Sequence, residues 1–103
     1  MAYEDIFTAL ADQTRRHIFE ALRDQPQTVG QLAEQQPVSR PAVSQHLKVL
    51  QEANLVTVEP RGNSRLYSIR RDGLVELRDY LDSFWSDALS AYSAEIARRM
   101  KTN

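Results

Sequence analysis

Cysteine is absent from this chain of 103 residues. Without a thiol the chain can form no disulfide, no thiolate metal site and no cysteine nucleophile, a composition that suits a reducing compartment. No apolar run approaches the ~18 residues that a membrane-spanning helix needs, and no signal-peptide pattern opens the chain. We therefore expect a cytoplasmic protein with no membrane partner.

The motifs of enzymes are also missing. Glycine occurs only three times, too rarely for a Gly-rich phosphate loop, and the two histidines fall on separate predicted helices. There is no paired-carboxylate motif, no repeat and no low-complexity segment. These absences argue against an enzyme, so we expect neither catalytic residues nor a cofactor. The length and the 42% hydrophobic content indicate one globular domain over residues 1–103.

Charge is unevenly distributed although the net charge is only −1. Residues 39–71 contain six basic and two acidic side chains, whereas residues 72–87 contain five acids and one arginine. A basic middle next to an acidic last third indicates one face that binds a polyanion and one solvated face.

The most informative stretch runs from Val38 to Leu50. Its apolar positions 43, 47 and 50 recur at helical spacing, and the other face carries cationic or short hydrogen-bonding side chains. Ser39 is a good N-cap, and Pro41 is tolerated in a first turn. The pattern predicts a recognition helix at about 39–53 that lies in the major groove of DNA.

Three shorter helices are expected before it. Ile6 and Leu10 indicate the first, and Asp12 caps a second that runs to about residue 23. Thr28 and Gln31 fit a capping box at the start of the third. Because a tight connection then leads into the recognition helix, the pair predicts a helix-turn-helix.

A β-hairpin follows the recognition helix. Asn54 is expected to end the helix in a left-handed cap. Residues 55–59 and 65–70 are rich in β-branched and aromatic side chains, and a turn at 60–64 separates them. A hairpin at about 55–70 in this position is a wing, and its basic tip could reach phosphate or the minor groove.

The last part of the chain predicts one long helix at about 73–98. Its apolar residues recur at three and four, including Leu77, Leu81 and Leu89. So long a helix exceeds what the small domain can cover, so a second copy of the chain is the simplest partner. The aromatic stripe around Trp85 could line a small-molecule pocket, but core or dimer interface is the commoner use of such a stripe. The fold expected is mainly α, a winged helix-turn-helix with a long C-terminal helix for dimerisation.

Three motifs together resemble the ArsR/SmtB-type winged-helix repressors. Residues 10–18 contain the Asp-x-Thr-Arg-Arg pattern, residues 39–50 are similar to the family's recognition helix, and Gly62 within residues 61–67 matches the wing. The resemblance covers about residues 5–95 and implies a bacterial or archaeal dimeric repressor. It also implies that the first and last helices form the dimer interface.

The metal sites of that family do not carry over. Its sensors place cysteines before the recognition helix, or acids and histidines on the last helix, and this chain lacks those donors. Asp79, Asp82 and Asp87 alone would make at best a weak site for a hard cation. We expect no metal ligands and metal-independent DNA binding, and the residues identify no inducer.

The DNA contacts divide by side-chain chemistry. Gln45 and Ser44 are the best candidates for base edges, because glutamine can pair with adenine through two hydrogen bonds. Arg40 could read guanine or hold phosphate, whereas Lys48 holds phosphate or solvates the helix. Groove contact is preferred for His46, with packing as the alternative. The full set of expected DNA-binding residues is Thr28, Gln31, Ser39, Arg40, Pro41, Ala42, Ser44, Gln45, His46, Lys48, Arg61, Asn63, Ser64 and Arg65.

Roles elsewhere are expected to be structural. Arg15 and Arg16 are read as intramolecular ion pairs ahead of phosphate contacts, and His17 as structural. The expected dimer interface comprises Ile6, Leu10, Leu77, Leu81, Phe84, Trp85, Leu89 and Tyr92.

Two functions remain in competition. The first is a sequence-specific transcriptional repressor that binds a pseudo-palindromic operator as a homodimer. The second is a winged-helix protein-interaction module without specific DNA binding. The position of the basic residues favours the first.

Overall fold

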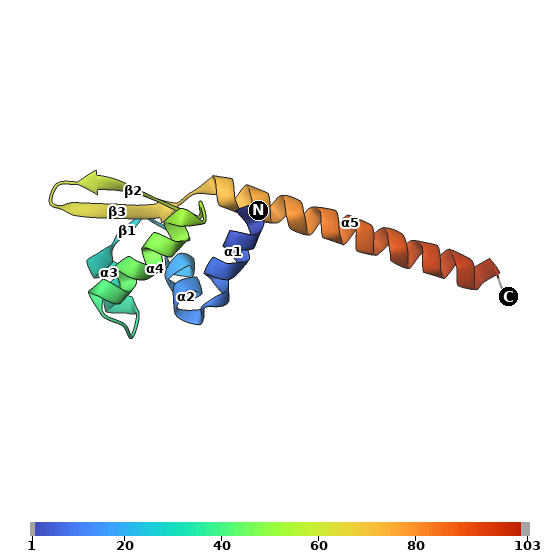
Figure 1. Cartoon of the computed structure of the whole chain (residues 1–103), viewed down its shortest axis with the longest axis horizontal. Coiled ribbons are helices and arrows are strands. Elements are labelled where there is room, and N and C mark those ends of the chain that lie inside the picture. Colours follow the sequence, from blue (N-terminus) through green and yellow to red (C-terminus); the bar gives the residue numbers. More distant parts are fainter. Residues whose placement is uncertain (1, 102–103) are drawn as a thin grey trace.

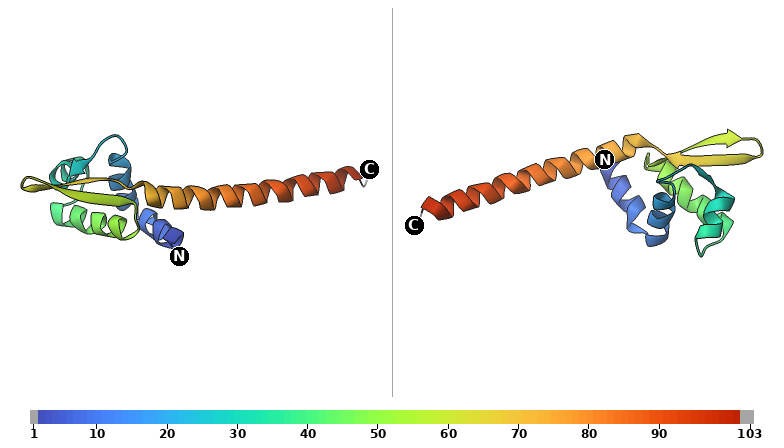
Figure 2. Two further views of the ribbon diagram at one scale, coloured as in Figure 1. Left: turned by 90° about the horizontal axis from the view of Figure 1, so that it is seen from above. Right: turned by 180° about the vertical axis from the view of Figure 1, so that it is seen from behind.

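The computed structural model describes residues 2–101 and has a helical body with two projections. The body contains α1 (Ala2–Ala11), α2 (Gln13–Ala21), α3 (Val29–Gln35) and α4 (Arg40–Glu52). A β-hairpin and the long helix α5 (Arg71–Lys101) project from opposite ends of this body (Figures 1 and 2). The molecule therefore measures 70 × 25 × 24 Å, because α5 lies largely outside the body.

Three helices begin where their capping residues predict. The Asp12 side chain accepts a hydrogen bond from the Arg15 backbone N–H at 2.9 Å. Thr28 and Gln31 form both bonds of the capping box, and Ser39 Oγ accepts from the Ala42 N–H at 3.3 Å. Each cap satisfies a backbone donor that has no partner inside its helix, so these starts follow from local sequence.

The core lies between α1, α2, α3 and α4, beneath the sheet. Val43, Leu47 and Leu50 are completely buried, which confirms the inner face predicted for the recognition helix. From the second helix Ile18 is buried while Phe19 is only partly so. The remaining buried apolar residues are Ile6, Ala9, Leu22, Leu32, Ala53, Leu55, Val56 and Tyr67.

The sheet has three antiparallel strands in the order β1–β3–β2. The wing strands β2 (Val56–Arg61) and β3 (Ser64–Ile69) agree with the predicted hairpin, but the turn is shorter, with only residues 62 and 63 between them. Gly62 has a φ of +60°, which glycine adopts without steric cost. The two-residue strand β1 (Gln27–Thr28) was not predicted, because so short a segment has no periodicity.

The two arginines after Asp12 hold the end of α1. Arg15 donates from Nε to the Ala9 carbonyl at 2.6 Å, and Arg16 donates from Nη1 to the Leu10 carbonyl at 2.7 Å. The last carbonyls of a helix lack helical donors and form the negative end of its dipole. The partners found are therefore backbone carbonyls, where the sequence had suggested carboxylates.

Helix α5 is longer than predicted and contacts the body only near its start. Tyr80 stacks on Tyr3 at a ring-centroid distance of 4.7 Å and meets the edge of Phe7 at 5.3 Å. Beyond Tyr80 the large apolar side chains are exposed: Leu81, Phe84, Trp85, Leu89, Tyr92, Ile96 and Met100. No helix within residues 2–101 has the length and apolarity to cross a membrane.

One residue of the expected dimer interface lies elsewhere. Ile6 is 0% exposed and belongs to the core of its own chain, so it cannot offer surface to a partner. Leu10 and Leu77 are partly buried against that core. The sequence could not tell core positions from interface positions, because the same apolar face of a helix can contact the core along one part and a partner along another.

Candidate nucleic-acid interface

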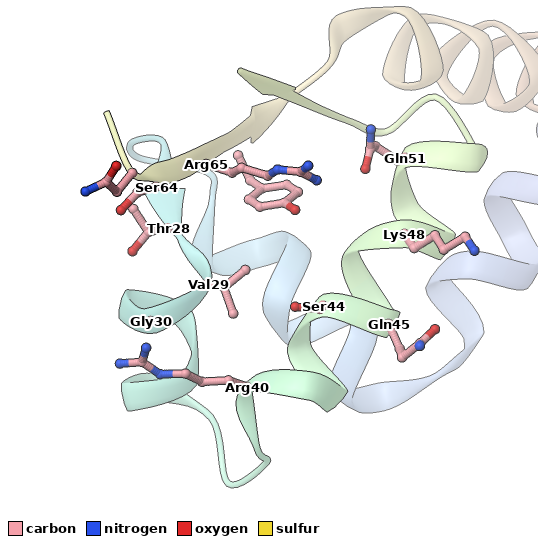
Figure 3. A pocket seen from close by; sticks show the side chains of 12 residues that line it. Thr28, Val29, Gly30, Arg40, Ser44, Gln45, Lys48, Gln51, Ser64 and Arg65 are labelled. Atoms are coloured by element: carbon pink, nitrogen blue, oxygen red, sulfur yellow. The ribbon is translucent and has the colours of Figure 1, made fainter. Parts of the chain in front are cut away.

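A polar groove of about 760 Å³ lies between α3, α4 and the wing (Figure 3). Three cationic side chains, Arg40, Lys48 and Arg65, belong to its lining, and no carboxylate does. A small-molecule pocket would instead be mostly apolar. The complete lining is Thr28, Val29, Gly30, Arg40, Ser44, Gln45, Lys48, Gln51, Asn63, Ser64, Arg65 and Tyr67.

Helix α4 supplies one wall of the groove. Its lining residues at 40, 44, 48 and 51 are four, four and three apart, so they share a helical face. Arg40 runs toward α3, where Gly30 leaves room for it (Figure 3). A Cβ at position 30 would lie only 3.1 Å from Arg40 Nη2.

The wing and the short strand β1 supply the opposite wall. Asn63, Ser64 and Arg65 come from the hairpin tip and the first residues of β3. Thr28 reaches the same wall because it pairs with Leu66 of β3. The unpredicted strand thus explains why the start of α3 and the tip of the wing border one groove.

Eight of the fourteen residues predicted to contact DNA line this groove, namely Thr28, Arg40, Ser44, Gln45, Lys48, Asn63, Ser64 and Arg65. The other six lie outside its lining. Gln31 and Ser39 are engaged in helix caps. Pro41 and Ala42 belong to the first turn of α4. Arg61 is exposed on β2 and pairs with Glu59 at 3.5 Å.

His46 points toward the body. It is half-buried, and its Nδ1 lies 3.5 Å from Nη1 of Arg15 on α2. The structure therefore places His46 at the contact between α2 and α4, which was the alternative to groove contact.

Sequence reasoning missed four lining residues, Val29, Gly30, Gln51 and Tyr67. Gln51 could have been found, since it continues the helical spacing from Ser44 and Lys48. Tyr67 could not, because alternation in β3 placed it on the inner face, where it is indeed 7% exposed. Tyr67 lines the groove because β3 lies beside β1 and contacts α3, which are contacts between distant segments.

Outside the groove, the cap at the start of α2 lowers the pKa of its own carboxyl group. The Arg15 backbone N–H lowers the pKa of Asp12, with smaller contributions from the charges of His46 and Arg15. Asp12 thus stays ionised at the start of α2, where the helix dipole favours negative charge.

Metal-ligating residues do not gather anywhere within residues 2–101. No group of three or more His, Asp or Glu side chains in that range could hold a metal ion. Asp79, Asp82 and Asp87 are exposed along α5.

A helix-turn-helix followed by a hairpin wing, with a cationic groove between them, defines a winged-helix DNA-binding regulator. The family model for bacterial regulatory proteins of the arsR family matches residues 12–58. The transcriptional regulator Rv2034 of Mycobacterium tuberculosis is 55% identical over 88 residues, which cover 85% of this chain and 82% of that protein. The chain therefore belongs to the arsR family and is a transcriptional regulator.

Two further proteins extend the comparison. The transcriptional repressor SdpR of Bacillus subtilis is 30% identical over 80 residues, covering 78% of this chain and 89% of SdpR. The crystal structure of a possible transcriptional regulator for arsenical resistance superposes with a TM-score of 0.73 and is 44% identical. That match covers 88% of this chain and 95% of the other.

Proposed function

We propose that the protein represses transcription as a homodimer that binds a pseudo-palindromic DNA operator. The observation that carries this proposal is the groove, whose lining holds three cations and no acid between a helix and a wing. A phosphate backbone supplies the complementary charge, and α4 has the dimensions to enter a major groove.

Base readout is assigned to the middle of α4. Ser44 and Gln45 both line the groove of the protein. Once α4 lies in the major groove of DNA, their side chains would reach base edges. Lys48 and Arg65 flank them and would hold phosphates, which fixes the register of the complex. Arg40 sits at the start of α4 beside Gly30, where it can reach either a guanine or a phosphate.

Dimerisation is assigned to α5. Phe84, Trp85 and Tyr92 are 62%, 64% and 65% exposed, and they continue the apolar face that begins at Leu77. Exposed apolar patches of this kind mark interaction surfaces. A second copy of α5 supplies a matching face, and a two-fold axis would place two recognition helices in successive major grooves, ~34 Å apart.

The alternative is a protein-interaction module without specific DNA binding. Such a module would need a partner with an acidic surface that fits this groove and matches the charges of Arg40, Lys48 and Arg65. Duplex DNA meets that requirement along its whole length, so the groove favours DNA. As a DNA-binding regulator the protein would act in the cytoplasm, at the nucleoid.

Selection from a pool of random duplexes tests the proposal. The wild type should enrich an inverted repeat with two half-sites one helical turn apart. A variant with Ser44→Ala and Gln45→Ala should enrich none, while Gln25→Ala, at an exposed position between α2 and β1, should behave like the wild type. A folded wild type that enriched no sequence would overturn specific binding and favour the interaction module.

A further inference from the structure

The segment just after the recognition helix and the start of α5 meet at a close backbone contact. Gly73, in the first turn of α5, is buried although the residues before it are exposed. A Cβ at position 73 would lie 2.5 Å from the Asn54 carbonyl oxygen and 3.0 Å from Leu55 Cδ2. Because the nearest atom belongs to the backbone, a larger residue could be accommodated only if the two helices moved apart.

Hydrogen bonds hold this contact in place. The Gly73 N–H donates to the Asn54 carbonyl at 3.0 Å, and the Arg70 N–H donates to the Leu55 carbonyl at 2.8 Å. Asn54 itself has a φ of +62°, which turns the chain sharply at the end of α4. Asparagine tolerates this conformation better than most residues do. The end of α4, the end of β3 and the start of α5 are thereby fastened together.

The Arg70 side chain closes the junction on its exposed side. Its guanidinium donates from Nη1 to Asn54 Oδ1 at 3.4 Å and from Nη2 to Asp72 at 3.0 Å. Asn54 is therefore held at its backbone by Gly73, in the first turn of α5, and at its side chain by Arg70, just before α5.

The orientation of α5 is set within its first ten residues, by this junction at its start and by the packing of Leu77 and Tyr80 against the body. Within the described part of α5, packing against the body ends near Tyr80. The helix has 31 residues, or roughly 46 Å at ~1.5 Å per residue. A rotation of about 10° at its base would displace its far end by roughly 8 Å over that length.

We propose that Gly73 and Asn54 form a positioning junction that sets the distance between the two recognition helices of the dimer. That distance decides which spacing of operator half-sites the protein accepts. The inference rests on the proposed homodimer, since α5 is the element through which one subunit would orient the other.

The test is a distance measurement in the dimer without DNA. Because the chain has no cysteine, Glu34→Cys on the exposed side of α3 provides a single site for a spin label. The distance between the two labels should be narrowly distributed in this background. Adding Gly73→Ala should shift or broaden the distribution, because the added methyl group must push α5 away from Asn54.

DNA binding gives the second readout. Operators whose half-sites are moved apart or together by one or two base pairs are titrated with each protein. Gly73→Ala should lose roughly tenfold or more on the spacing that the wild type prefers, since half-site spacing is a geometric requirement. Its preference should move toward another spacing or become flat.

A milder pair of variants covers the case in which Gly73→Ala does not fold. Arg70→Ala removes the guanidinium group that donates to Asn54 Oδ1. Arg78→Ala is the matched control, because it removes an arginine that pairs with an aspartate of the same helix, Asp79, at 3.7 Å. Arg70→Ala should broaden the distances between the labels, while Arg78→Ala should leave them unchanged.

The outcomes separate the two proposals. A dimer in which both the label distances and the spacing preference survived Gly73→Ala and Arg70→Ala would overturn the positioning junction alone. A monomer by sedimentation would overturn the homodimer and the junction with it.

Discussion

Individual side chains in this protein divide between building the helix-turn-helix and lining the polar groove. Arg15 and Arg16 belong to the first kind, because their guanidinium groups hold the last carbonyls of α1. Arg40 and Arg65 belong to the second, since they line the polar groove. The same residue type therefore has opposite roles, and the partner that lies within reach decides which one applies.

At the groove, base and phosphate contacts should respond differently to truncation. Gln45→Ala should lose ~1–3 kcal/mol on the specific operator and flatten the preference at one base pair. Arg65→Ala should weaken all sequences alike and lower the salt slope by about one for each phosphate that Arg65 no longer neutralises, counted over both subunits. Titrations of matched and random duplexes at several salt concentrations would show this. A selective effect of Arg65 with a neutral Gln45 would reverse the assigned roles.

At the start of α2, Asp12 should make stability depend on pH. Since folding lowers its pKa below the usual value of 3.8, its contribution is present above about pH 4 and is lost as the pH falls through the lowered value. Asp12→Asn keeps a capping side chain that does not titrate. Urea unfolding of both proteins should show the wild type losing stability relative to the variant below pH 4. Parallel pH profiles would exclude this role.

Among the secondary-structure elements, α4 contributes to both the core and the groove. One face is completely buried through Val43, Leu47 and Leu50, and the other borders the groove. Its first turn must be in place for Arg40 and Ser44 to be presented correctly, and the cap at Ser39 secures that turn. The wing depends in a similar way on its pairing with β1, which ties it to the helix-turn-helix.

Removing the cap of α4 should be measurable as a loss of stability. Ser39→Ala removes the hydroxyl that accepts the Ala42 N–H, and such a change typically costs ~1 kcal/mol. The free energy of unfolding in urea is the measurement. Ser90→Ala, at an exposed position inside α5, serves as the control and should change stability little. Equal effects of the two substitutions would show that the cap contributes nothing of its own.

The whole molecule is unusual in how much apolar surface one chain leaves uncovered. The seven large apolar residues after Tyr80 on α5 are all at least 39% exposed, and the short helices of the body lie too far away to cover them (Figure 1). A second chain is therefore part of the proposed working state.

Placing a charge on that face should separate the subunits. Leu81→Asp removes an apolar side chain from the proposed interface and adds the cost of desolvating a carboxylate. Sedimentation should show a monomer, Trp85 fluorescence should move to the red, and operator affinity should fall steeply because the second half-site is no longer engaged. Ser83→Asp, an exposed position outside the expected interface, should remain a dimer. A wild type that was monomeric and still bound the palindrome tightly would contradict this account.

Metal ions should not regulate the assembled protein. Operator affinity should change by less than about tenfold, or roughly 1.4 kcal/mol, when a strong chelator, zinc or arsenite is added. The expectation follows from the lack of cysteine in the chain and of histidine in the last helix. A larger change with any of the three would refute metal-independent binding.

Local chemistry in the sequence was sufficient to predict the starts of α2, α3 and α4, the buried face of α4 and the class of protein. The caps at Asp12, Thr28 and Ser39 act within three residues of themselves, and helical periodicity needs only the chain itself. The same holds for the apolar face of α5, whose length alone indicated that one chain could not cover it.

Tertiary structure decided what depends on residues far apart in the chain. Strand β1 exists only because β3 lies beside it, His46 turns to α2 because Arg15 is there, and Ile6 serves the core because α1 packs inward. The contact of Gly73 with Asn54 is of the same kind. Each of these contacts joins residues that are far apart in the sequence. The pattern of residues within one segment cannot show which other segment the fold places beside it.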